Sequence, residues 1–184
     1  MKTIAKIFII STFLIHSAFA QKFITKTGHI RFYSDAPMEK IEANNNQVNS
    51  AIDFSTGDFI FKVLMKSFEF QKALMQEHFN ENYAESNKFP NASFKGKITN
   101  LKDVNLSKDG IYNVNVEGDL TLHGVTKPVK TVGTLEVKSG KIIGKSKFYI
   151  NLSDYDIKIP NTVVNNISNK VEITVDITLD KLNK

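Results

Sequence analysis

Cysteine and tryptophan are absent from this chain, and its 184 residues include only four histidines and four prolines. Without cysteine the protein has no disulfide, no thiolate nucleophile and no thiolate metal ligand. A lipid-anchored export signal is excluded for the same reason, because such a signal is cleaved at a cysteine. We therefore expect packing alone to stabilise the fold.

Motifs that carry chemistry are also scarce. His29, His78 and His123 are too widely spaced for a paired metal motif such as His-x-x-x-His. The sequence contains no Gly-x-Ser-x-Gly turn and no phosphate-binding glycine loop. Asp154 and Asp156 could form a carboxylate pair, although stabilisation of a loop is the simpler interpretation. The sequence thus predicts no catalytic residue, no metal site and no cofactor, and we do not expect an enzyme.

The first residues have the pattern of a targeting segment. Lys2 and Lys6 precede a mostly apolar run at 7–14, and the sequence Ala-Phe-Ala, which supplies the small residues of a cleavage site, ends at Ala20. These features predict a secretory signal peptide over residues 1–20 and a mature domain over residues 21–184. No later stretch approaches the ~20 apolar residues that a membrane-spanning helix needs. We expect an exported protein, periplasmic or secreted.

Charge does not favour a nucleic-acid partner. Removing residues 1–20 takes away two of the 24 basic residues and none of the 19 acidic ones, so the formal net charge falls from +5 to +3. The lysines are spread along the predicted strands and turns, which is typical of solvated outer faces. No linker-like stretch and no repeat of fixed period divides the chain, so one domain is expected.

Alternation of apolar and polar residues is abundant. At 171–179 five aliphatic residues occupy one face and Glu, Thr, Asp and Thr the other, which is the pattern of a strand with one buried face. Similar patterns predict strands at residues 28–34, 40–43, 48–54, 58–65, 92–99, 111–122, 129–137 and 141–152.

One segment has a different period. Residues 70–84 carry apolar and aromatic side chains at helical spacing. Short links at 55–58, 108–110 and 138–140 join neighbouring strands, and only antiparallel pairing permits such links. Many antiparallel strands with a single helix predict an all-β fold, a closed antiparallel β-barrel with one packed α-helix.

Several segments resemble a known family. The matching stretches are residues 75–83, residues 89–94 with Gly96, and residues 118–129. They closely resemble the YceI-like family of exported bacterial proteins, and Leu-Thr-Leu-His-Gly-Val-Thr-Lys-Pro at 120–128 is the most specific piece. The resemblance covers essentially the whole mature chain. It departs from the family at 32–43, which looks like a variant subgroup, and at Met75-Gln76, which replace a more usual Arg-led polar pair.

The resemblance implies a lipocalin-like barrel, a helix beside it, and an elongated apolar cavity that carries polyisoprenoid-type or other long-chain lipids. Composition alone favours a solid core instead, because 14 phenylalanines can fill a small barrel. The resemblance reverses this preference, and we expect an exported lipid carrier. A ligand-free structural or stress-response barrel that acts through protein contacts is the alternative. An enzyme acting on a lipid headgroup would need a cluster that the sequence does not assemble.

The faces predicted to line the cavity supply the ligand-binding residues. They are Ile30, Phe32, Phe59, Phe61, Val63, Leu74, Met75, Phe79, Phe94, Val114, Val116, Leu120, Leu122, Phe148, Ile173, Val175 and Ile177. The expected partner is an apolar lipid, isoprenoid-like or fatty acyl, and no other cofactor is expected. A transient membrane contact and a homodimer remain open.

Overall fold

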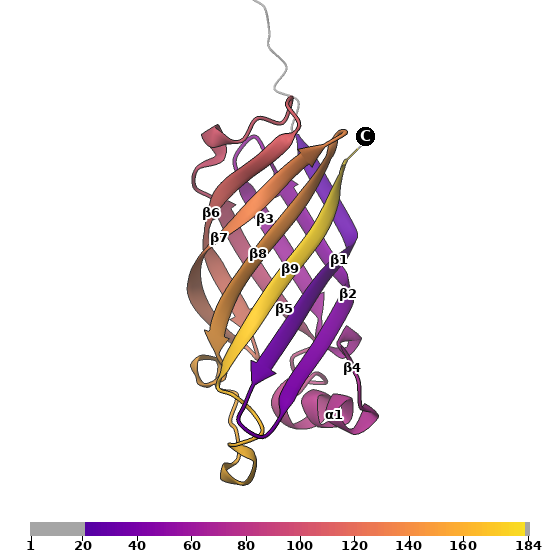
Figure 1. Ribbon diagram of the computed structural model, residues 1–184, viewed down its shortest axis with the longest axis vertical. Coiled ribbons are helices and arrows are strands. Elements are labelled where there is room, and N and C mark those ends of the chain that lie inside the picture. The colour runs from indigo at the N-terminus through magenta and orange to yellow at the C-terminus, as the bar shows by residue number, and fades with distance from the viewer. Residues whose placement is uncertain (1–20, 183–184) are drawn as a thin grey trace, which may run out of the picture.

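The computed structural model describes residues 21–182, which form an elongated β-barrel whose strands tilt across its long axis (Figure 1). Eight strands close the ring in the order β1-β2-β3-β5-β6-β7-β8-β9, and every neighbouring pair is antiparallel. The strands are β1 (Lys22–Asp35), β2 (Lys40–Asp53), β3 (Asp58–Leu64), β5 (Asn91–Ile98), β6 (Gly110–Leu122), β7 (Val125–Lys138), β8 (Lys141–Asn151) and β9 (Lys170–Lys181). The short β4 (Glu69–Phe70) pairs with β2 outside the ring. The predicted all-β barrel is confirmed.

The predicted signal peptide lies outside the described residues. Within residues 21–182, no helix is long and apolar enough to cross a membrane.

The predicted break within the second strand is wrong. Residues 40–53 form one continuous strand, although three asparagines lie in its middle. Asn45 is fully buried, and its side chain donates to the Leu64 carbonyl oxygen at 2.9 Å and accepts from the Gln47 backbone N–H at 2.9 Å. These hydrogen bonds compensate the loss of water, so a polar residue is accommodated inside the barrel.

The predicted helix over 70–84 is shorter in the structure. Helix α1 (Ala73–His78) is followed by a π-helical turn, η2 (Phe79–Tyr83), and Phe70 belongs to β4. The Asn80 side chain donates to the Gln76 carbonyl oxygen at 2.8 Å. Such a local side-chain bond competes with regular α-helical hydrogen bonding, and the wider turn follows at this point.

Two connections also differ from the prediction. The link between β5 and β6 spans residues 99–109 and contains a 3-10 turn, η3 (Leu101–Asp103), so it is longer than a tight turn. β7 begins at Val125 and includes Pro128. Proline lacks the N–H that a strand donates and is found in strands mainly where one side has no partner.

The two ends of the barrel are built differently. At the upper end in Figure 1, where β7 turns into β8 and β9 finishes, a cluster of buried side chains fills the interior. This plug consists of Phe23, Ile52, Phe54, Ile98, Val114, Leu135, Val137, Ile142, Ile177 and Leu179. Helix α1, the β1–β2 turn and the link from β8 to β9 lie at the lower end (Figure 1).

Candidate functional site

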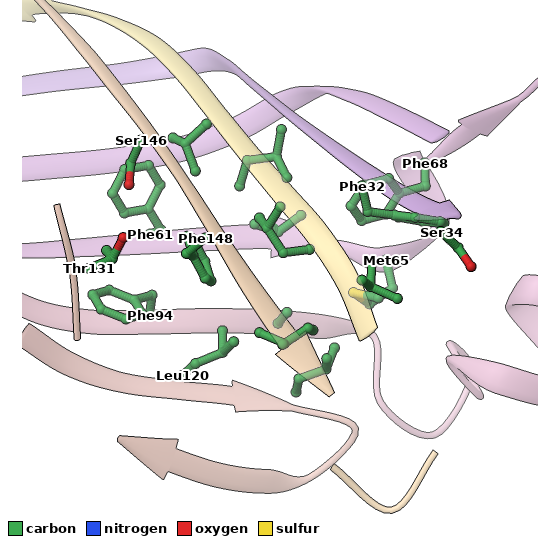
Figure 2. Close-up of a pocket in the computed structure, with 18 of the residues that line it drawn as sticks. Phe32, Ser34, Phe61, Met65, Phe68, Phe94, Leu120, Thr131, Ser146 and Phe148 are labelled. Carbon is green, nitrogen blue, oxygen red and sulfur yellow. The ribbon is translucent and has the colours of Figure 1, made fainter. Parts of the chain in front are cut away.

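A cavity of about 440 Å³ occupies the barrel below the plug and reaches the lower end. Figure 2 shows Phe61 and Phe94 near Ser146 in one part of the cavity, and Phe32 and Met65 in the other. Aliphatic and aromatic side chains make up most of its wall. The interior is therefore filled by side chains at the upper end, whereas a cavity occupies the barrel below it.

Most of the predicted ligand-binding residues lie on this wall. The sixteen that line the cavity are Ile30, Phe32, Phe59, Phe61, Val63, Met75, Phe79, Phe94, Val114, Val116, Leu120, Leu122, Phe148, Ile173, Val175 and Ile177. Leu74 does not line the cavity and is 60% exposed. Leu74 and Met75 are neighbours on α1, so their side chains point about 100° apart around the helix, and only Met75 lines the cavity.

Aromatic packing shapes the lower part of the wall. Phe32 on β1 lies within 5.4–5.6 Å, centroid to centroid, of the rings of Phe68, Phe70 and Phe79. Sequence alternation does not find Phe68 and Phe70, because Phe68 lies just before the strand β4 and Phe70 lies in β4, which has only two residues and shows no period. Rings at these separations stabilise one another beyond their burial, so the connection between β3 and α1 forms a firm part of the wall.

Polar groups gather where the cavity meets the lower end. Glu39 in the β1–β2 turn accepts from Lys72 Nζ at 3.4 Å and from Asn166 Nδ2 at 3.5 Å. Glu39, Asn166 and the exposed His78 all line the cavity. Tyr83 also lines it, and burial raises the pKa of its phenol. The sequence gives no sign of Glu39 and Asn166, since both lie outside regular elements.

His123 does not line the cavity. Its Nδ1 is 3.1 Å from the Tyr155 carbonyl oxygen and its Nε2 is 2.6 Å from Glu85 Oε2. His123 has a φ of 51° in the tight β6–β7 turn. These contacts tie the β6–β7 turn to Tyr155 and to Glu85.

The other ionisable candidates do not converge. Asp154 accepts from Asn151 Nδ2 at 3.1 Å, and Asp156 has a φ of 57° at the end of a 3-10 turn. Among residues 21–182, no group of three or more His, Asp or Glu side chains is arranged to hold a metal ion. The arrangement offers apolar contact along the barrel and hydrogen bonds at one end.

An eight-stranded antiparallel barrel with a short helix at one end and an internal apolar cavity defines a lipocalin-like barrel. The sequence model of the YceI-like domain matches residues 12–179, and the chain belongs to the YceI-like family.

Solved structures share this fold at low sequence identity. A polyisoprenoid binding domain from Saccharophagus degradans, implicated in plant cell wall breakdown, matches with a TM-score of 0.76 at 14% identity, covering 89% of this chain and all of its own. BcnA of Burkholderia cenocepacia gives 0.69 at 14% identity, covering 84% of this chain and 96% of its own. The YceI protein of Campylobacter jejuni gives 0.56 at 13% identity over 100% of both chains. A search of curated proteins found no match.

Proposed function

We propose that this protein is an exported carrier that holds a long apolar lipid, of isoprenoid or fatty-acyl type, inside its barrel. The observation that carries the proposal is the cavity of about 440 Å³ with its mainly aliphatic and aromatic wall. Each buried methylene contributes ~0.8 kcal/mol, so about ten of them contribute roughly 8 kcal/mol, comparable with micromolar affinity. Family membership and the neighbour described as polyisoprenoid binding support this ligand class.

The orientation of the ligand follows from the two ends. The plug closes the upper end with apolar side chains, whereas Glu39, Asn166 and His78 line the cavity at the lower end. A polar head would lose its hydrogen bonds against the plug. The tail therefore points toward the plug and the head stays at the lower end.

The wall supplies shelter from water rather than a reacting group, so binding and not catalysis is proposed. Export is proposed on the secretory pattern of residues 1–20.

A charge placed on the cavity wall tests the proposal. Phe61 lines the cavity, whereas the neighbouring Ile60 on β3 is 42% exposed and does not line it. We expect Phe61→Glu to lower the affinity for geranylgeraniol at least tenfold and Ile60→Glu to leave it nearly unchanged, because only the first charge must be desolvated by the bound chain. Native mass spectrometry measures occupancy, and circular dichroism checks folding. Unchanged occupancy in a folded Phe61→Glu variant would contradict the carrier function.

A further inference from the structure

Strands β7 and β8 pair over only part of their length. Their register begins at the turn that joins them and ends at Gly133↔Ser146. Beyond that point β7 still pairs with β6, and β8 still pairs with β9. Residues 125–132 and residues 147–151 therefore each have a neighbouring strand on one side only. This unpaired stretch of the wall is the seam.

The two strands are in close contact just above the seam. A Cβ on Gly133 would lie 2.6 Å from the Lys145 carbonyl oxygen. Ser146 Oγ donates to the Val132 carbonyl oxygen at 2.8 Å. The strands are thus held together down to this hydrogen bond, and their pairing stops at once below it.

The cavity reaches both sides of the seam. Thr131 and Gly133 on β7 line it, as do Ser146 and Phe148 on β8. Figure 2 shows Thr131, Ser146 and Phe148 around the same part of the cavity. Three of these four residues are small, so a chain passing between the strands would meet one bulky side chain, that of Phe148.

A segment that follows β8 covers the lower part of the seam. This flap, residues 152–157, contains the 3-10 turn η4 (Leu152–Tyr155). Tyr155 and Ile157 are buried in a cluster against which Leu122 and Val125, on the other side of the seam, pack. The flap thus meets the β7 side of the seam through side-chain packing, without a strand ladder.

His123 fastens the flap. It sits in the turn just before β7, and its Nδ1 is hydrogen-bonded to the carbonyl oxygen of Tyr155 in the flap. Glu85 holds the opposite ring nitrogen.

On its own side of the seam the flap is also anchored by backbone N–H groups of Leu152 and Ser153, which donate to Asn169. Across the seam it is held by the His123 hydrogen bond and apolar contacts, which are weaker than a continuous ladder, and segments held in this way open at lower free energy.

The unpaired edge of β7 is poorly suited to another protein strand. Pro128 has no N–H to donate, and Lys127 and Lys130 are exposed beside it. Proline and lysine on an edge protect it against strand addition. An apolar chain needs no hydrogen bond from the edge and is not affected by these features.

We propose that the seam is a side entrance to the cavity, through which the apolar chain slides between β7 and β8 when the flap moves away from His123. The inference rests on the proposed carrier function and adds the route of uptake. A side-on route suits a cavity whose upper end is closed by the plug, because a long chain need not be threaded end-first from the lower end.

The absence of cysteine permits a direct test. Lys130 and Tyr149 would be opposite each other if the register continued across the seam, and both are exposed. Lys130→Cys with Tyr149→Cys is cross-linked with a bismaleimide whose spacer contains a reducible disulfide. The control is Glu136→Cys with Ile143→Cys, a pair already in register on the same strands whose residues do not line the cavity. Uptake of the fluorescent fatty acid cis-parinaric acid is followed by stopped-flow fluorescence.

The cross-link across the seam is expected to slow uptake at least tenfold, and cleavage of the spacer should restore the rate. The control cross-link should change the rate less than twofold. His123→Ala should speed uptake at least threefold without changing the equilibrium affinity. Uptake unaffected by the seam cross-link overturns the side entrance, and an unchanged rate in His123→Ala overturns the fastening of the flap. If the unmodified protein binds neither cis-parinaric acid nor geranylgeraniol, the carrier function itself fails.

Discussion

Gly96 on β5 and Gly118 on β6 lie opposite each other in register, and the space left by their missing side chains is occupied by the ring of Phe94. A Cβ on Gly118 would lie 2.5 Å from the Gly96 Cα and 2.8 Å from the Phe94 ring. Phe94 in turn stacks on Phe59, with centroids 5.5 Å apart and 17° between the ring planes. The two glycines therefore allow stacked rings to lie close against the barrel wall.

Gly118→Ala should destabilise the protein. The added methyl group would meet backbone atoms as well as the Phe94 ring, so the strands must shift, and overpacking of this kind costs about 1–3 kcal/mol. At Gly110 the nearest atom to an added Cβ is the Tyr112 hydroxyl at 3.6 Å, which is ordinary contact. Gly110→Ala is the matched control, and chemical denaturation measures both free energies of unfolding. Equal stabilities of the two variants would contradict the close approach at Gly118.

His123→Ala should lower the free energy of unfolding by about 1–3 kcal/mol, since it leaves hydrogen-bond acceptors without a partner. Equilibrium lipid binding should be retained, because His123 does not line the cavity. His78→Ala serves as a control at an exposed position and should change stability by less than about 0.5 kcal/mol. Loss of binding at full thermal stability would instead make His123 a contact of the lipid head.

Helix α1 should respond to lipid more than the strands do. It has six residues and no side-chain N-cap, and none of its residues is buried, so its amides should exchange readily when the cavity is empty. Met75 and Phe79 line the cavity and would contact a bound chain. Hydrogen exchange should show greater protection of residues 72–83 on loading, and a smaller gain at 171–179. Equal protection with and without lipid would show that this segment is a fixed part of the wall.

Acid should weaken an ion-pair network on the outer face of the barrel. Arg31 lies 2.8 Å from Glu42 and 3.4 Å from Glu172. Hydrogen bonds from Tyr149 and then Lys147 lower the pKa of Glu172, and hydrogen bonds from Arg31 and then Asn44 lower the pKa of Glu42.

Because both folded-state pKa values lie below the ordinary glutamate value of 4.5, the stabilisation is present above that pH and is lost as the pH falls through the lowered values. Glu172→Gln should therefore be less stable than the unaltered protein at pH 7, by about 1 kcal/mol or less. The difference should shrink below about pH 4. Thermal melts of both proteins across this range measure it, and a difference independent of pH would exclude the carboxylate charge as its cause.

Local pattern predicts the long strands well and the irregular segments poorly. Alternation at 171–179 locates β9 (Lys170–Lys181) almost completely, and the same period places Phe61 and Val175 on the inner wall. The buried Asn45 interrupts the apolar face of β2. Its burial is not predictable from the local sequence, because the carbonyl oxygen that accepts its hydrogen bond belongs to Leu64, in another strand. Glu39 and Asn166 come together only once the barrel has brought their loops to one end. Periodicity within a segment does not predict contacts between loops that are distant in the sequence.

The plug gives the interior a fixed depth. Under the proposed function, a tail that reaches the plug can advance no further, and any surplus carbons remain at the lower end beside Glu39 and Asn166, where water is accessible. The cavity would then select ligands by chain length, and tails that just fill its depth would bind most tightly. Leu135 belongs to the plug and also lines the cavity. Leu135→Ala would deepen the cavity and shift the preferred ligand toward longer chains.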